Sequence, residues 1–363
     1  MKKTLLFLSL TLSGWARPYI PQLVDVPLTQ LQAKYAKLIA KEPKNARHHY
    51  VLGRLNAIAY STGKAEFQVN QDNKLPWFGP LDSGFPPNPP LDPKAGARYL
   101  SSALAEYAKA VELDPKNLPA RLGYAWCLEQ AGRKPEALKQ YRLVFEAAAA
   151  RDLDPKGPHF GVSLTEETGR YLLELLDKDK DAGEIAEIQA SMQAARKIPR
   201  AVTPVLIPLE RGLGFEGLVN RSARVAFDLD GTGLLRKWQW ISPRAGWLVY
   251  LDRRPSVTSG LQMLGGSTFW IFWKDGYEAM AALDADGDGW LRGSELRALK
   301  VWCDDGDGVS QPSELRSLDS LGIEALSVRG RAFREGSWSE RGVRYRDGFV
   351  GPSYDWMPRA APE

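Results

Sequence analysis

One segment near the end of the chain carries carboxylates at a spacing that suits a hard metal cation. The stretch LDADGDGWLRGSEL, residues 283–296, places acidic residues at positions 1, 3, 5 and 12 of a loop with glycine at its bend. Calcium takes roughly six to eight oxygen ligands, and alternate side chains of such a loop point inward around the ion. The predicted ligands are Asp284, Asp286, Asp288, the main-chain carbonyl of Trp290, and Glu295.

The neighbouring residues refine this prediction. Leu291 should pin the loop to an apolar core, whereas Arg292 places a positive charge near the ion, so we expect looser binding than in an all-acidic loop. The flanking stretches YEAMAAL (277–283) and SELRAL (294–299) can both be helical, as the EF-hand motif requires. The alternative is a solvent-exposed Asp-Gly turn that holds no ion.

A second acidic loop, CDDGDGVSQPSEL, covers residues 303–315. Counting back from Gly308 puts Cys303 at the first ligand position, and a thiol is a poor ligand for a hard cation. Asp304 could replace it in a loop that is one residue shorter. The weaker candidate ligands are therefore Asp304, Asp305, Asp307, the carbonyl of Val309, and Glu314. The alternative is an acidic turn that docks against the first loop.

A third stretch, FDLDGTG (227–233), supports two interpretations. It resembles the nucleophile motif of haloacid dehalogenase-like phosphatases, a resemblance that implies phosphorylation of Asp228. Such an enzyme needs a doubly wound sheet and a phosphate-binding lysine, but we expect Lys300 on the short helix that leaves the first loop. We therefore favour a strand-ending turn shaped by Asp228 and Asp230, without a tight metal site.

Other catalytic signatures are missing from the sequence. It contains no GxSxG, HExxH, GxxxxGK or CxxC motif. We expect no enzymatic activity, and we keep an exported hydrolase, such as a phosphatase that uses Asp228, as the alternative. A purely structural protein with every acidic loop empty is a further possibility.

The elements around these loops are short β-type runs separated by turn signals, beginning near residue 198. We expect a linker at 198–223 and a small, mostly β domain at 224–363 with inserted EF-hand loops. Residues 225–328 resemble the EF-hand-containing calcium-binding modules of bacterial secreted proteins. This resemblance implies calcium binding, with the ion as a structural staple, and it implies no reaction.

The first half of the chain carries a different pattern. The stretches KEPKN (41–45), LDPKN (113–117) and LDPKG (153–157) each close a helical run, and they resemble the ends of tetratricopeptide repeats. We expect a helical array over residues 29–197, with a Pro-rich insertion at about 64–96. The predicted fold is α + β in two domains. Such arrays bind partners in a concave groove, so we expect a protein or peptide partner there.

Composition sets the remaining expectations. The formal net charge of +4 over 363 residues points to neither nucleic acid nor an anionic membrane. Residues 1–16 have two lysines, an apolar run and small residues near Ala16, which predicts a cleaved signal peptide and a secreted or periplasmic protein. No later stretch is apolar enough to predict a membrane span. Cys127 and Cys303 fall in different predicted domains, and we expect two free thiols.

Overall fold

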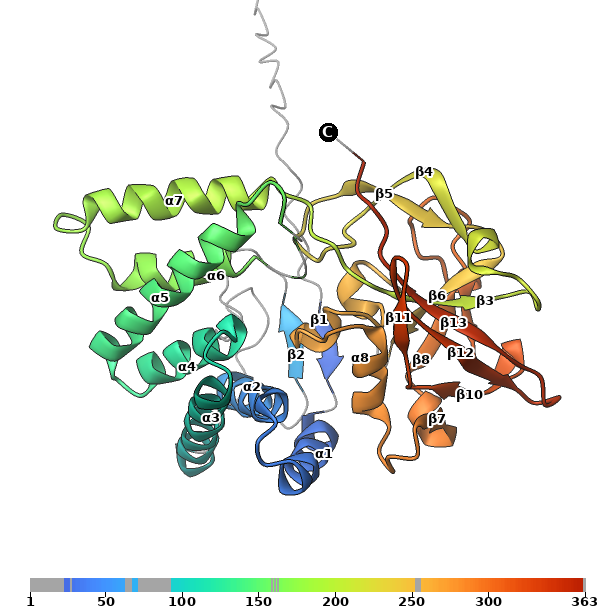
Figure 1. Ribbon diagram of the computed structural model, residues 1–363, viewed down its shortest axis with the longest axis horizontal. Coiled ribbons are helices and arrows are strands. Elements are labelled where there is room, and N and C mark those ends of the chain that lie inside the picture. Colours follow the sequence, from blue (N-terminus) through green and yellow to red (C-terminus); the bar gives the residue numbers. More distant parts are fainter. Residues whose placement is uncertain are drawn as a thin grey trace, which may run out of the picture.

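The structure is a computed structural model that describes residues 23–26, 28–62, 67–70, 93–157, 159, 161, 163–251 and 256–361. A helical half is followed along the chain by a mostly β half (Figure 1). This arrangement confirms the predicted α + β fold class. The predicted signal peptide at 1–16 and most of the insertion at 64–96 lie outside the described residues.

The helical half is built from antiparallel helix pairs, as the repeat pattern predicts. The helices are α1 (Leu28–Lys41), α2 (Ala46–Thr62), α3 (Pro93–Leu113), α4 (Leu118–Gln130), α5 (Lys134–Asp152), α6 (Leu164–Leu175) and α7 (Ala182–Arg196). Local chemistry sets their ends: Ser163 caps α6 by accepting a hydrogen bond from the Glu166 N–H, and Asn117 caps α4 in the same way. Gly132, with φ of 77°, makes the turn between α4 and α5.

Small residues let these helices approach closely. A methyl group at Gly123 would lie 2.2 Å from the ring of Tyr107, so α3 and α4 meet at a position where only glycine fits. Ala137 and Tyr141 of α5 are fully buried in the same core. The core that α3 and α4 share therefore continues into α5.

The β half centres on a nine-stranded sheet that curls into a half-barrel (Figure 1). Its order is β7-β10-β12-β13-β3-β6-β8-β9, and β11 also pairs with β12. The strands are β3 (Val205–Pro208), β6 (Ala245–Tyr250), β7 (Trp290–Arg292), β8 (Leu299–Trp302), β9 (Leu315–Ser317), β10 (Ile323–Ser327), β11 (Arg331–Phe333), β12 (Gly336–Tyr345) and β13 (Val350–Trp356). Strands β4 (Val219–Phe227) and β5 (Arg236–Ile241) form a separate pair, and β1 (Leu23–Val26) pairs with β2 (Phe67–Asn70).

Tryptophans fill the core between the sheet and the β4–β5 pair. The fully buried indoles are those of Trp238, Trp240, Trp247, Trp302 and Trp356. Most of them meet edge-to-face, and the Trp247 and Trp356 rings are stacked at 5.9 Å. Many tryptophans of this half therefore serve as core residues.

The segment 198–223, expected as a linker, contributes to this sheet. Strand β3 lies within it, between β13 and β6, and all four of its residues are buried. The apolar run of Val205, Leu206 and Ile207 has no polar alternation because both faces of the strand are covered. The β half therefore begins before residue 224.

The helix expected after the first acidic loop is a further correction. In its place the chain makes a single 3-10 turn, Gly293–Leu296, and then enters β8 at Leu299. Only two residues separate the turn from the strand, which leaves no room for an α-helix. Lys300 therefore lies on β8, and the prediction that it sits on an exit helix is wrong.

The two halves touch at both ends of the helical array (Figure 1). At one end, α1 and α2 meet helix α8 (Gly276–Leu283), where Gln30 Nε2 donates to the Leu283 carbonyl at 3.2 Å. At the other end, the chain that follows α7 meets the turn at 228–233. The array therefore forms an arc that the β half closes, with the β1–β2 pair inside it.

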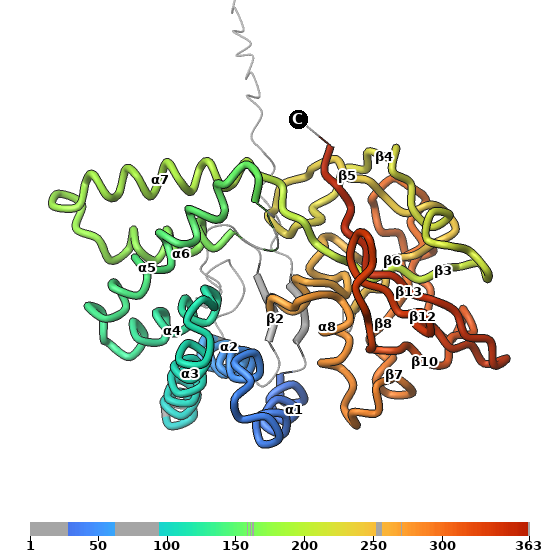
Figure 2. Tube along the Cα trace, viewed as in Figure 1, coloured from blue at the N-terminus to red at the C-terminus, as the bar shows by residue number. Residues whose placement is uncertain are grey.

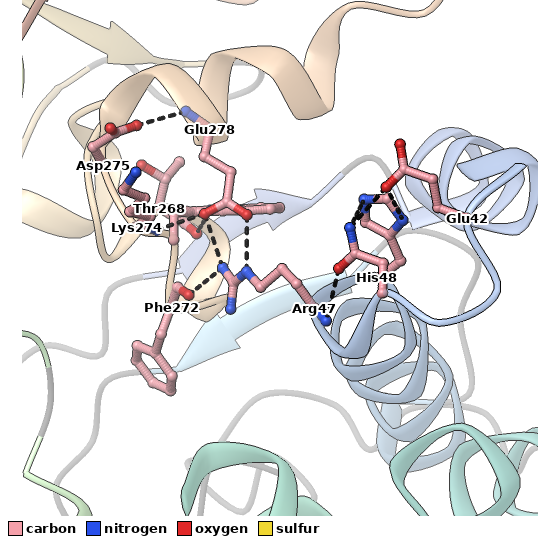
Figure 3. A network of polar contacts seen from close by, with 10 residues as sticks. Glu42, Arg47, His48, Thr268, Phe272, Lys274, Asp275 and Glu278 are labelled. Carbon is pink, nitrogen blue, oxygen red and sulfur yellow. Dashed lines mark hydrogen bonds and ion pairs between the residues drawn. The ribbon is translucent and has the colours of Figure 1, made fainter. Parts of the chain in front are cut away.

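Figure 3 shows the polar contact at the α2 end of this interface. Arg47 binds the carboxylate of Glu278 through two nitrogens, at 2.8 and 3.1 Å, and also donates to the Phe272 carbonyl. The Lys274 N–H donates to the same carboxylate at 2.6 Å. A short segment of the β half is thus held to the array by one arginine.

In Figure 2 the chain runs on from β13 and ends at the top of the view, beside β5. The Ala361 N–H donates to the Lys237 carbonyl at 2.7 Å, and the Gln239 N–H donates to the Arg359 carbonyl at 2.9 Å. The last described residues therefore extend the β4–β5 pair at the β5 edge.

Candidate metal sites

The first acidic loop is held at both ends by regular structure. Helix α8 leads into it, and Asp275 caps that helix by accepting from the Glu278 N–H at 2.9 Å. Strand β7 leads out of it and pairs with β10, so that Leu291 lies opposite Leu326. Leu291 is fully buried, as its predicted anchoring role requires.

Hydrogen bonds inside the loop shape the turn around its first carboxylate. Asp284 is buried, and its two oxygens accept from the N–H groups of Gly287 at 2.8 Å and Gly289 at 3.1 Å. Both glycines have positive φ, 77° and 92°, which side-chain-bearing residues rarely adopt. Asp286 accepts from the Asp288 N–H at 3.0 Å. The loop is therefore folded with its carboxylates over its own backbone.

Glu295 closes the loop from the opposite side. Its Oε1 accepts from the Ala285 N–H at 2.6 Å and its Oε2 from the Arg292 N–H at 2.9 Å. Carboxylate oxygens of Asp284, Asp286 and Glu295 consequently lie within 4.8 Å of one another. Three of the five predicted ligands are brought together.

The Asp288 carboxylate is not part of that cluster, and the fifth predicted ligand, the Trp290 carbonyl, lies at the start of β7. The Asp288 carboxylate faces the Arg292 guanidinium at 3.3 Å, the residue that we expected to weaken the site. The Trp290 indole packs beneath Arg344, whose guanidinium carbon is 4.4 Å from the ring centre. An ion bound by Asp288 would compete with this ion pair with Arg292.

A lysine of the helical half also reaches this loop. Lys34 Nζ, on α1, donates to the Asp284 main-chain carbonyl. Burial lowers the pKa of Lys34, and the carboxylates of Asp284, Glu295 and Asp286 oppose that shift. No sequence pattern predicts this contact, because Lys34 and Asp284 are 250 positions apart.

The second loop repeats the hydrogen-bond pattern of the first with one residue fewer. The buried Asp304 accepts from the Gly306 N–H at 2.9 Å and the Gly308 N–H at 3.1 Å, as Asp284 does from its two glycines. Asp304 therefore takes the first position, in agreement with the shorter of the two loops that the sequence allows. Cys303 stays outside the loop, with its thiol directed to the Val301 carbonyl at 3.8 Å.

Two tryptophan indole N–H groups donate hydrogen bonds to carboxylates of this second loop. Trp240 Nε1 donates to Asp304 at 2.6 Å, and Trp302 Nε1 donates to Glu314 at 3.1 Å. Burial raises the pKa of Asp304 to about 6, against the opposing effect of the Trp240 hydrogen bond. The loop is thereby tied to the tryptophan core.

The predicted ligands of the second loop divide into two groups. Carboxylate oxygens of Asp304, Asp305 and Asp307 lie within 4.8 Å of one another. Glu314 accepts from the Asp305 N–H at 3.1 Å but is not part of that cluster. This loop offers a smaller set of converging carboxylates than its sequence suggests.

In the turn at 228–233, as in the two loops, the first aspartate accepts a hydrogen bond from the N–H of a glycine further along the turn. Asp228 Oδ1 accepts from the Gly233 N–H at 3.1 Å. Asp230 has a different use: its carboxylate accepts from the Thr232 hydroxyl at 2.7 Å and from the Arg200 N–H at 3.2 Å. Arg236 lies 3.5 Å from the same carboxylate. The partners of Asp230 are protein groups that hold the turn in place.

Arg200 continues this network into the helical half. Its guanidinium lies 3.3 Å from Asp152, at the end of α5, and both side chains are buried. Burial alone would raise the pKa of Asp152, but Arg200 and Arg151 hold it below its usual value. Asp152 also accepts from the Thr165 N–H at 3.1 Å, at the start of α6. The turn at 228–233 is therefore an anchor between the two halves.

These observations define a helical-repeat array joined to a tryptophan-rich β half that carries three acidic turns. Residues 97–153, which hold α3 to α5, match the family model described as Tetratricopeptide repeat. Residues 211–345, which hold all three acidic turns, match the family model described as SPM domain. Neither match supports the resemblance to EF-hand modules, and the comparison with curated proteins gave no match.

The tetratricopeptide match confirms the repeat prediction for the middle of the array. In the SPM match, β3 and β13 fall outside the matched residues although they are neighbours within the sheet. Among the described residues, every helix is too short or too polar to cross a lipid bilayer. The two cysteines, Cys127 and Cys303, are free thiols.

Proposed function

We propose that the protein is an exported, calcium-stabilised interaction protein. The helical array supplies the interaction domain, in line with its tetratricopeptide match. The first acidic loop supplies the main ion site. The single observation that carries the calcium proposal is the convergence of Asp284, Asp286 and Glu295 in a loop whose ends are fixed by α8 and β7.

The donor set suits the ion. Three carboxylates within 4.8 Å of one another repel each other, and hard divalent cations prefer oxygen ligands of this type. Asp284, Asp286 and Glu295 would hold the ion, with Asp288 and the Trp290 carbonyl as the remaining predicted ligands. A bound ion would neutralise this negative charge and stabilise the loop as a staple between α8 and β7. If the dissociation constant lies about a hundredfold below the free calcium concentration, binding adds about 2.7 kcal/mol to stability.

The second loop is proposed as a weaker site. Its cluster lacks Glu314, and Asp304 already accepts from an indole at 2.6 Å. An ion there would compete with hydrogen bonds that join the loop to the tryptophan core. We therefore assign the stronger binding to the first loop.

The partner of the array is proposed to be a protein or peptide. A cavity of about 250 Å³ lies between the array and the β half, lined by Arg151 and Leu164 on one side and Phe272 and Trp273 on the other. The β1–β2 pair and the β half already cover much of the concave side (Figure 1). A partner in the groove would therefore contact both halves.

Export is proposed from residues 1–16, whose lysines and apolar run are typical of a signal peptide.

We further propose that the protein has no catalytic activity. Asp228, the nucleophile of the phosphatase alternative, is 2% exposed, and its carboxylate accepts from the Gly233 N–H. Asp230 is engaged by Arg200 and Arg236. These contacts favour structural roles for both residues. Lys300 lies on β8 and does not bear on this choice.

Terbium luminescence tests the calcium proposal directly. Trp290 belongs to the first loop, so a terbium ion bound there should be sensitised by excitation of the indole. Glu295→Gln should remove most of the signal because it takes away a charged ligand at the end of the loop. Glu314→Gln is the matched control, since it makes the same change in the second loop and should leave most of the signal.

Calcium competition and thermal unfolding complete the experiment. Calcium should displace terbium and raise the melting temperature, and Glu295→Gln should reduce that rise. The absence of sensitised luminescence, together with a melting temperature that neither calcium nor a chelator shifts, would refute the proposed site.

A further inference from the structure

A hollow of about 590 Å³ lies beside the first acidic loop, between that loop and the β11–β12 hairpin. We call it the arginine groove. Its main side chains are Arg329, Arg331, Arg341, Arg344, Trp290 and Trp338. The clustered carboxylates of Asp284, Asp286 and Glu295 do not line it, whereas Asp288 and Trp290 belong to both the acidic loop and the groove.

The groove concentrates positive charge. Four arginines line it against two acidic residues, Asp288 and Glu340, a net charge of +2. It contains no lysine. Arginine presents a planar fork of donors that binds carboxylates through two parallel hydrogen bonds, whereas lysine acts as a point charge. The choice of residue therefore favours recognition of planar oxyanions.

Aromatic rings hold two of these guanidinium groups in place. The Arg344 guanidinium carbon lies 4.4 Å from the centre of the Trp290 ring, and that of Arg331 lies 4.7 Å from the centre of the Trp338 ring. A guanidinium over a ring is attracted by the ring electrons and keeps its in-plane N–H groups available. Trp338 also stacks on Tyr354 at 5.9 Å, which fixes the platform. The Arg331 and Arg344 side chains therefore lose less conformational entropy when a ligand binds.

The acidic residues of the chain leave much of this charge unpaired. Arg331 pairs with Glu340 at 3.1 Å, on an exposed part of the groove. Arg329 donates only a long hydrogen bond, 3.4 Å, to the Asp288 carbonyl. Within the described part of the chain, Arg341 and Arg344 make no ion pair. Two guanidinium groups are thus free to bind an external anion.

We propose that the arginine groove binds an acidic peptide segment of a protein partner. Several separately placed guanidinium groups call for several carboxylates along one chain, which a run of Asp or Glu provides. Arg331 and Arg344 already cover faces of Trp338 and Trp290, so bases or sugars have less ring surface on which to stack. The tetratricopeptide match independently associates this chain with protein partners.

Binding of a fluorescein-labelled poly-glutamate peptide, followed by anisotropy, tests this proposal. All titrations contain the same calcium concentration, so that the acidic loops are in one state throughout. Arg341→Gln combined with Arg344→Gln should weaken binding by roughly tenfold or more, because two charge-assisted contacts are lost. Binding by the unchanged protein should also weaken as ionic strength rises.

The matched control combines Arg133→Gln with Arg142→Gln. These two arginines lie at the start of α5 and within it, and their side chains are 47% and 46% exposed, so the same net charge is removed far from the groove. The control should bind like the unchanged protein. Arg341→Gln alone serves as a second test variant, since that exposed residue has no described ion pair and its loss should not disturb folding.

Three results would overturn the proposal. The first is equal binding of poly-glutamate by the groove variants and the unchanged protein. The second is equal affinity for poly-glutamate and an uncharged peptide of the same length. The third is tighter binding of single-stranded DNA or a sulfated polysaccharide than of poly-glutamate, with the same loss in the groove variants, because the groove would then serve another class of polyanion.

Discussion

Single carboxylates set the shape of all three acidic turns. Asp228, Asp284 and Asp304 each accept from the N–H of a glycine that completes the turn. The Asp-x-Asp-Gly pattern at Asp228 and Asp284 predicted this turn, because a short carboxylate bonds backbone groups a few positions ahead. It could not predict the partners that come from far along the chain, such as Lys34 for Asp284 and Trp240 for Asp304.

Asp355 gives a residue-scale prediction about pH. It is buried, and burial raises its pKa well above the usual value, so the carboxyl is protonated in the folded protein at pH values where the unfolded chain is ionised. Its Oδ2 accepts from the Gly276 N–H at 3.0 Å, at the start of α8. Because the unfolded pKa is about 4, the contribution of Asp355 to stability is greatest below about pH 4 and falls as pH rises above it.

Asp355→Asn should remove that dependence, since the amide resembles the protonated acid and keeps the acceptor for Gly276. Urea unfolding at several pH values should show a smaller loss of stability with rising pH in this variant than in the unchanged protein. Asp355→Ala is the matched comparison and should cost about 1–3 kcal/mol by leaving the Gly276 N–H unpaired. An identical pH profile for Asp355→Asn and the unchanged protein would contradict the assignment.

At the scale of elements, the helices were easier to predict than the strands. Pro, Gly and capping residues punctuate the helical runs, and the periodic apolar face needs only local contacts. Strand β3 was misplaced in a linker because Val205, Leu206 and Ile207 show no alternation and their sheet neighbours lie elsewhere in the sequence. The exit helix after Glu295 was wrong because strand pairing of Leu299 overrides the helical propensity of the preceding residues.

The α3–α4 contact gives a prediction about one glycine. Gly123→Ala places a methyl group 2.2 Å from the Tyr107 ring, so α3 and α4 must separate, and we expect a loss of about 1–3 kcal/mol. Gly183→Ala, on α7, is the matched control: nothing lies within 4 Å of its added methyl group. This control should gain roughly 0.5–1 kcal/mol from helix propensity. Denaturant unfolding measures both, and similar values for the two variants would refute the close contact.

On the scale of the whole molecule, one half-buried and one buried arginine contact join the halves at opposite ends of the array. Arg47 with Glu278 secures the α2 end of the array, and Arg200 with Asp152 and Asp230 secures the α7 end. Neither contact is visible in the sequence, because each joins residues of opposite halves or distant elements. The domain pattern predicted which halves exist and gave no information on how they meet.

A double-mutant cycle on Arg47 and Glu278 measures one of these contacts. Combining Arg47→Gln with Glu278→Gln should give a coupling energy of roughly 1–2 kcal/mol, since both side chains are less than a third exposed and bind through two hydrogen bonds. The matched control is the pair Arg133 and Glu136, at the exposed start of α5, where the coupling should be about 0–0.5 kcal/mol. Equal coupling in the two cycles would mean that the interface contact adds nothing beyond an exposed ion pair.

The strand order has a consequence for how the protein is made. Strand β3 takes its place between β13 and β6, so the sheet stays incomplete until β13 has been synthesised. The helical array depends on near neighbours and can fold as it emerges. The apolar edge of β3 is exposed for most of that time, which is a hazard for aggregation. Shortened products of this chain should therefore be soluble when they end after α7 and insoluble when they end just before β13.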